Sequence, residues 1–178
     1  MVHFPIAFLS SSQILDTTYF LTTHARTAPL VASIYNIKPY LSDITRTSHL
    51  FLALGLLTAV PAIITGGYEI TQLLSRQAVA DKIAAADGAQ GKKKVIQQTH
   101  PKVKMAFLHA IVMDIVVAGA AFNWWSRRSA PAGVPSDLNV LIAAVTGFFF
   151  MGAGSLGAQL VFNHGVGVHA AGALKKQQ

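Results

Sequence analysis

The residues of this sequence best suited to chemistry are histidines and carboxylates within or beside long apolar stretches. Three of the seven histidines and one glutamate lie at or near the ends of four such stretches, one residue in each. We expect these four residues at the same level of the membrane: His3, His109, His164 and Glu69. Three imidazoles and a carboxylate at one level can bind a transition metal, and two imidazoles can ligate a haem iron. We therefore predict His109, His164 and His3 as haem b or metal ligands, with Glu69 orienting an imidazole or handling a proton.

Each of these residues also has a structural interpretation. His164 precedes a glycine and can cap a helix end, His3 can lie at the membrane interface, and His109 can hydrogen-bond Glu69. The alternative hypothesis is therefore a non-catalytic membrane scaffold or assembly subunit with a structural histidine network. The choice between a cofactor site and a structural network depends on how the helices rotate about their axes, because this rotation decides whether the histidines meet. The sequence therefore leaves open whether the protein is an enzyme.

Two aspartates, Asp16 and Asp114, also lie within apolar stretches. Ionisable residues at membrane depth are costly and often functional. Asp114 follows His109 at about 140° around a helix, so the two do not share a face. The aspartates either pair inside the bundle, stay protonated, or join the histidines in a proton or ion pathway, which is the weaker third hypothesis.

Several other kinds of chemistry are excluded by the sequence. The chain has no cysteine, which removes disulfides, iron–sulfur clusters and cysteine nucleophiles. It also has no phosphate-binding glycine loop, no Gly-x-Ser-x-Gly elbow and no His-Glu-x-x-His zinc motif. If haem binds, electrons would pass to or from a lipid-soluble or soluble carrier.

The elements that position these residues are membrane-spanning helices. Of the 178 residues, 52% are hydrophobic and only 12% are charged, about half the usual charged share of roughly 25%. A span needs about 20 mostly apolar helical residues, and four stretches qualify: 4–23, 49–75, 103–126 and 138–163. The first is the weakest, because serines, Gln13 and Asp16 interrupt it. We predict an all-α integral membrane four-helix bundle that forms a single domain over residues 1–178.

Four spans place both termini on one side of the bilayer, together with the Lys-rich loop 77–101. This side carries nine of the 14 lysines and arginines, and the side of loop 25–47 carries five. The positive-inside rule then predicts that both termini face the cytoplasm or matrix. The basic clusters suit anionic lipid headgroups better than nucleic acid. We also expect the helix of the second span to continue into loop 77–101 until Asp87-Gly88 breaks it. A short interfacial helix is expected in loop 25–47, and a frayed tail over 172–178.

Small residues and aromatic anchors complete the predicted packing. Pro61 should bend the second span. Glycines in the last span allow close helix packing or homo-oligomer contacts, and alternatively clear space for a flat cofactor: Gly147, Gly152, Gly154 and Gly157. Trp124 and Trp125, followed by Arg127 and Arg128, are typical of an interfacial anchor. The expected partners are the lipid bilayer and a second copy of the chain.

Four stretches resemble the family of predicted four-helix membrane proteins known as domain of unknown function 2231: VHFPIAF at 2–8, PAIITGG at 61–67, His109-Ala110, and LVFNHGVGV at 160–168. The resemblance covers about Val2 to Val168. It implies four spans and marks three histidines as matching the family's motifs: His3, His109 and His164. It implies no function. The loops 25–47 and 77–101 depart from the family's shorter pattern.

Overall fold

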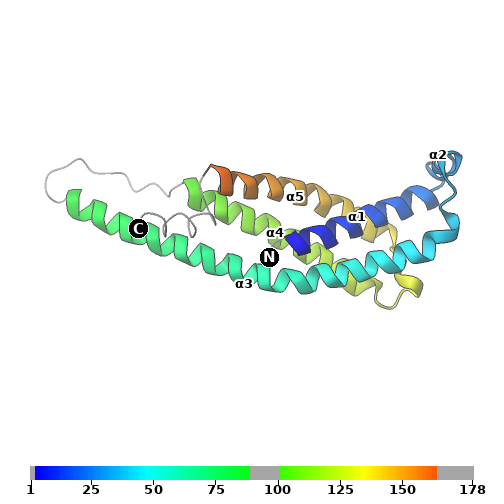
Figure 1. The fold of residues 1–178 in the computed structure, drawn as a ribbon, viewed down its shortest axis with the longest axis horizontal. Helices are drawn as coiled ribbons and strands as arrows, with labels where there is room; N and C mark the ends of the chain where they lie inside the picture. The colour runs from blue at the N-terminus through cyan, green and yellow to red at the C-terminus, as the bar shows by residue number, and fades with distance from the viewer. Residues whose placement is uncertain (1–2, 89–100, 164–178) are drawn as a thin grey trace, which may run out of the picture. The chain divides into compact units, whose positions relative to one another are not determined.

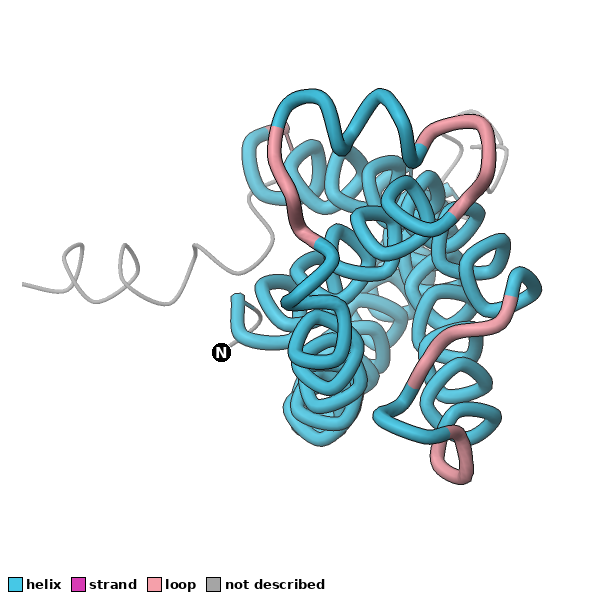
Figure 2. The backbone as a smooth tube through the Cα atoms, turned by 90° about the vertical axis from the view of Figure 1, so that its right-hand side faces the viewer, coloured by secondary structure: helices cyan, strands magenta, loops and turns pink. Residues whose placement is uncertain are grey.

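The computed structural model describes residues 3–88 and 101–163 of the chain. These residues form helices joined by turns, with no strand among them (Figure 2). The four long helices are α1 (His3–Thr23), α3 (Leu41–Gly88), α4 (Pro101–Arg127) and α5 (Asp137–Phe162) (Figure 1). The short elements are α2 (Ala28–Ile34) and the 3-10 turns η1 (Lys38–Tyr40) and η2 (Pro131–Gly133). The predicted all-α membrane fold is confirmed.

Three helical segments of the described chain are long and apolar enough to cross a membrane: Lys38–Ile83, Pro101–Arg127 and Pro131–Phe162. Helix α1 is not among them. Its 21 residues extend about 31 Å, enough for the roughly 30 Å hydrocarbon layer. Its composition is the obstacle, because Ser10, Gln13 and Asp16 interrupt the apolar sequence. Crossing by α1 therefore depends on turning these polar groups towards other helices.

Helix α3 is longer at both ends than the predicted span 49–75. It begins at Leu41 and carries Asp43 in its first turn, where a carboxylate interacts favourably with the helix dipole. It continues through Pro61 and ends at Gly88, at the break expected from Asp87-Gly88. Parts of both predicted loops are therefore helical. Residues 89–100 and the tail 172–178 lie outside the described part.

The chain divides into two compact units. The first unit comprises the described residues of Met1–Ile63 and Met113–Met151, and the second those of Ile64–Val112 and Gly152–Gln178. Helix α1 belongs to the first unit alone, whereas α3, α4 and α5 each contribute a segment to both units. The organisation as one domain over 1–178 stays a prediction.

Four helical segments build the first unit: α1, the start of α3, the end of α4 and the start of α5. The buried side chains recur every three or four residues on each helix, as in left-handed bundles. They are Pro5, Leu9, Ser12 and Asp16 on α1, with Thr22 six residues further on; Thr45, Ser48, Leu52, Gly55 and Ala59 on α3; Val116, Ala120, Asn123 and Arg127 on α4; and Asn139, Ala143 and Thr146 on α5. Most of these residues are small or polar.

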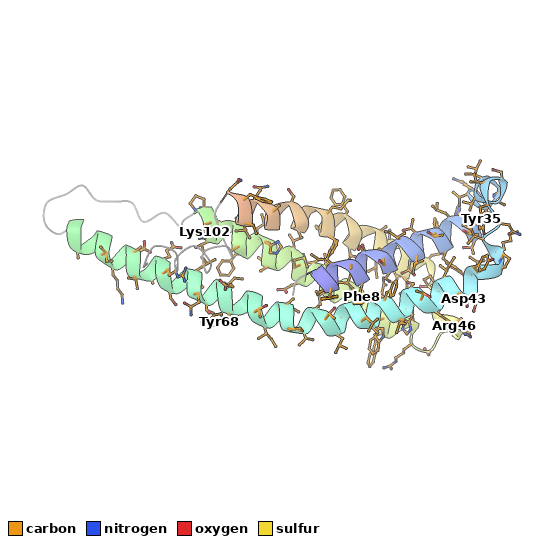
Figure 3. The ribbon with its side chains drawn as sticks, viewed as in Figure 1. Phe8, Tyr35, Asp43, Arg46, Tyr68 and Lys102 are labelled. Carbon is orange, nitrogen blue, oxygen red and sulfur yellow. The ribbon has the colours of Figure 1, made fainter. Side chains whose placement is uncertain are left out.

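Large apolar side chains of the first unit face outwards instead. Leu57 and Met151 are each 68% exposed, and Phe148 is 72% exposed. Phe8, labelled in Figure 3, meets Phe51 of α3 with ring centroids 5.7 Å apart. A core of small and polar residues inside an apolar surface is the arrangement expected in lipid, where small residues let helix backbones approach.

Helix α2 lies between α1 and α3 and has no buried residue. Leu30 is 68% exposed and Ile34 is 87% exposed. Tyr35, which follows α2, lies at the same end of the first unit as Asp43 and Arg46 of α3 (Figure 3). The expected short helix in loop 25–47 is therefore present, and its apolar exposed surface fits an interfacial position.

The second unit contains the later half of α3, the start of α4 and the end of α5. Its buried apolar residues come from α4 and α5: Val103, Ala106, Ala153 and Leu160. The α3 segment has no buried residue among those described, and Tyr68 is 62% exposed on it (Figure 3). Contacts between α4 and α5 therefore provide the core of this unit.

Candidate functional site

The predicted ligand residues are only partly within the described structure. His109 lies on α4 and Glu69 on α3, both in the second unit, and Glu69 is exposed. Asp114, also on α4 and exposed, belongs to the first unit. The side chain of His3 and the whole of His164 lie outside the described part. No group of three His, Asp or Glu side chains suited to a metal occurs among the described residues. The ligand assignments stay predictions.

His109 is held by the neighbouring helix α5. Its Nδ1 lies 2.9 Å from the backbone carbonyl oxygen of Ala153. A carbonyl oxygen only accepts hydrogen bonds, so Nδ1 must carry the proton. In the neutral imidazole, Nε2 then has the free lone pair, and Nε2 has no hydrogen-bond partner among the described residues. The ring is therefore oriented and tautomerically fixed.

A glycine makes this position of the His109 ring possible. A Cβ atom at Gly157 would lie 3.2 Å from His109 Cε1, closer than ordinary van der Waals contact. Gly157 and Ala153 are four residues apart on α5 and therefore lie on one face. Thus one of the predicted small residues of the last span serves to seat an imidazole.

The most elaborate polar site in the described chain is an ion pair in the first unit. Arg127 at the end of α4 and Asp16 on α1 are both 1% exposed. The Arg127 Nη1 donates to Asp16 Oδ2 at 2.8 Å and to Oδ1 at 3.0 Å. Ser48 of α3 donates from its Oγ to Asp16 Oδ1 at 2.5 Å. Three helices therefore meet at one carboxylate.

The rest of the Arg127 guanidinium is bonded to backbone carbonyls. Its Nε donates to Gly133 O at 2.8 Å, and its Nη2 donates to Thr45 O at 3.4 Å. Gly133 has a φ of +64°, which glycine adopts without steric cost. A Cβ there would also meet His49 at 2.9 Å. The ion pair thus ties the η2 turn to three helices.

The position of Arg127 corrects the expected interfacial anchor. Arg127 is buried and neutralised by Asp16. Arg128 is exposed, and its guanidinium carbon lies 3.4 Å from the ring centroid of the exposed Trp125. The anchor role of this second arginine stays a prediction. The sequence marks both residues as unusual, Asp16 as a charge inside an apolar stretch and Arg127 as a charge at the end of a span, but it does not pair them. Of the alternatives for Asp16, the structure shows pairing inside the bundle, and its place in a proton pathway stays a prediction.

Two further polar contacts surround this ion pair. Asn139 of α5 donates from Nδ2 to Asn123 Oδ1 of α4 at 3.0 Å, and Asn123 Nδ2 donates to Asn139 O at 3.0 Å. His49 of α3 lies with Nε2 3.2 Å from Trp124 O of α4. These bonds satisfy buried polar groups, as apolar surroundings require. Their arrangement is that of a rigid, internally paired structural site.

Glycines allow the closest helix approaches in the first unit. A Cβ at Gly55 of α3 would lie 2.5 Å from Leu9 Cδ2 of α1, and one at Gly119 of α4 would overlap Thr146 of α5. By contrast, Gly152 and Gly154 of the second unit have open space around them. Among the glycines predicted in the last span, Gly157 therefore packs internally, and these two do not.

Comparison with known proteins adds the family. No curated protein and no solved structure matches the chain. A family model described as a predicted membrane protein, DUF2231, matches residues 1–170. This span contains all the described helices and the four stretches that carry the resemblance. The chain therefore belongs to the family of predicted membrane proteins DUF2231, whose function is unknown.

Proposed function

We propose that this integral membrane protein binds haem b and transfers electrons, with His109 as an axial ligand through Nε2. The observation that carries the proposal is the hydrogen bond from His109 Nδ1 to Ala153 O, 2.9 Å long. Metal-ligating histidines characteristically donate their other ring N–H to a carbonyl or carboxylate, which fixes the ring and directs the lone pair. His109 has this arrangement.

The chemistry of the donor set fits haem better than a thiolate-bound metal, because the chain has no cysteine. His164 and His3 remain the predicted second ligands, and Glu69 remains a candidate to orient an imidazole or handle a proton. Bound haem would supply a one-electron couple. The protein residues would fix the ligand tautomer and exclude water, and the partner would be a lipid-soluble or soluble electron carrier.

An absorbance spectrum of the detergent-purified protein, oxidised and then dithionite-reduced, tests this proposal. We expect a Soret peak and reduced α and β bands in the wild type. His109→Ala should remove the bands or shift them. His24→Ala is the matched control, because His24 is exposed in the turn after α1, and it should leave the spectrum unchanged. A featureless spectrum from haem-replete cells, with a blank metal analysis, would overturn the proposal.

A structural scaffold is the second candidate, and a different observation favours it. Two histidines are half-buried between described helices, and each bonds to a backbone carbonyl oxygen of the helix that follows in the chain. His109 bonds to Ala153 O, and His49 bonds to Trp124 O. Such bonds hold helices together without any cofactor. On this hypothesis His109→Ala costs about 1–3 kcal/mol of stability and leaves no spectral trace.

We further propose that both termini face the cytoplasm or matrix. The two sides carry nine and five of the 14 lysines and arginines, and the positive-inside rule places the richer side in the cytoplasm or matrix. Single cysteines at the exposed Arg26 and Arg76 would test this with a membrane-impermeant thiol reagent, because the chain has no other cysteine. Arg26→Cys should react in sealed cells or organelles and Arg76→Cys only after permeabilisation. The reverse pattern would refute the orientation.

A further inference from the structure

Helix α2 lies across the end of the first unit. Figure 1 shows α2 nearly end-on and Figure 2 shows it from the side, so its axis runs across the axes of α1 and the start of α3. Helix α2 has no buried residue, which leaves most of its surface open to another molecule. A helix that lies across the end of membrane-spanning helices runs along the membrane surface, where amphipathic helices bind lipid.

The exposed apolar face of α2 continues the lipid-facing surface of its neighbours. Leu30 and Ile34 are four residues apart and share one face of α2, and they are 68% and 87% exposed. Leu21 near the end of α1 and Leu50 of α3 are also exposed, at 38% and 55%. Because the membrane-spanning helices place the bilayer beside this end of the unit, lipid is the molecule that adjoins the apolar face of α2.

Two basic residues flank α2, with no acidic residue between them. Arg26 lies two residues before the helix, and Lys38 lies four residues after it. The stretch 17–42 contains no Asp or Glu. Both side chains are exposed, and neither forms an ion pair with the described residues. Basic residues beside an exposed apolar helix face are complementary in charge to anionic phospholipid headgroups.

We infer that α2 is a lipid-docking helix, with Leu30 and Ile34 in the top of the acyl layer and Arg26 and Lys38 bound to the phosphates of anionic phospholipids. Tyr35, directly after α2, is 62% exposed and adds an amphipathic ring of the kind that is enriched at membrane interfaces. This lipid contact goes beyond haem binding, because it needs no cofactor.

Fluorescence quenching in vesicles tests the position of α2. The chain has no cysteine, so one introduced cysteine carries an environment-sensitive fluorophore at a single site. The purified protein is reconstituted at low density in phosphatidylcholine and phosphatidylglycerol, with a nitroxide near the top of the acyl chains. The label at Ile34→Cys should be strongly quenched. Ala32→Cys is the matched control, because Ala32 is exposed on the opposite side of α2, and its label should be quenched much less.

Two results of this experiment would overturn the inference. One is equal quenching of the labels at Ile34 and Ala32. The other is a label at Ile34 that is shielded from a water-soluble quencher but is not quenched by the lipid nitroxide, because a second copy of the chain would then cover the helix. The orientation of the protein in the vesicles does not affect the comparison, since both leaflets carry the nitroxide.

Removal of charge tests the recognition of the headgroup. The readout is quenching of the Ile34→Cys label by nitroxide-labelled phosphatidylglycerol relative to nitroxide-labelled phosphatidylcholine. Arg26→Gln and Lys38→Gln should each lower this preference by up to roughly fivefold, the contribution of one basic residue at a membrane surface. Added salt should also lower it. Both positions are exposed, so the circular dichroism spectrum should stay unchanged.

Lys82→Gln is the control for charge, because Lys82 is exposed on α3 in the second unit, and it should leave the preference unchanged. A wild-type protein with no preference for phosphatidylglycerol would overturn the inference. So would an equal loss of preference in Lys82→Gln, because net charge and not the flanks of α2 would then attract the lipid.

Discussion

Replacing Arg127 by methionine should destabilise the first unit more than any neighbouring charge substitution. The side chain makes five hydrogen bonds, to Asp16 Oδ1 and Oδ2, Ser48 Oγ, Gly133 O and Thr45 O. Methionine fills similar volume but donates none of them. The variant therefore leaves the carboxylate of Asp16 buried with Ser48 as its remaining donor.

The expected size of the effect follows from the burial of both charges. Breaking a buried ion pair by removing one partner costs about 3–5 kcal/mol, because the other charge stays desolvated. This corresponds to a factor of roughly 10² to 10⁴ in the folding equilibrium constant. Arg128→Met is the matched control. Arg128 is exposed and stacks on Trp125, a contact that contributes about 0.5–1 kcal/mol at an exposed site.

A buried thiol provides the assay. Ala120 is 5% exposed in the core cluster with Leu9 and Leu52, so Ala120→Cys in the cysteine-free chain reacts with a thiol reagent only on unfolding. Each variant is made in this background, and thiol reactivity is followed as sodium dodecyl sulfate is added to mild detergent micelles. The midpoint should shift strongly for Arg127→Met and little for Arg128→Met.

A double variant separates the ion pair from simple loss of packing. In Asp16→Leu with Arg127→Met, no charge is left buried, and apolar replacement of a buried pair is often neutral or stabilising. The double variant should therefore be more stable than Arg127→Met alone, with a coupling energy of about 2 kcal/mol or more. If Arg127→Met unfolds like Arg128→Met, or the double variant is worse than the single one, the ion pair is not what holds these helices.

Two further changes probe helix contacts with the same assay. Gly119→Leu should cost about 1–3 kcal/mol, because its side chain would overlap Thr146 on α5; Gly66→Leu, at a glycine with open space around it, should change the midpoint little. His49→Ala should cost about 1–3 kcal/mol by leaving Trp124 O without its ring donor, and an unchanged midpoint would mean that water replaces the imidazole.

The helices were largely predictable from hydrophobic runs, and Asp87-Gly88 predicted where α3 ends, but hydropathy did not predict where α3 begins. The predicted span 49–75 marks where α3 is apolar, whereas the helix itself covers Leu41–Gly88. Helical hydrogen bonding continues through polar residues such as Asp43 and Arg46 once a nucleus has formed. Membrane boundaries depend on side-chain polarity, and helix boundaries depend on backbone geometry, so hydropathy predicts the first better than the second.

The pairing of Asp16 with Arg127 was beyond sequence reasoning for a geometric reason. The two residues are 111 positions apart in the chain. Whether they meet depends on the rotation of α1 and α4 about their axes, which a hydrophobic run leaves undetermined. The outward-facing position of Asp114 on α4 was easier to predict. Buried residues recur every three or four positions on this helix: Val116, Ala120, Asn123 and Arg127. Once one of them is known to be buried, helix geometry places Asp114 on the opposite side.

The buried ion pair also bears on how α1, which is not among the three helices apolar enough to cross a membrane, packs with the others. The polar groups that weaken α1 as an isolated span are those that bond other helices: Ser12 meets Ser48, Gln13 donates to Thr146, and Asp16 meets Arg127. Lipid offers these groups no partner. We therefore expect α1 to cross the bilayer only in contact with α3, α4 and α5, and the carboxylate on α1 is what allows a buried arginine at the end of α4.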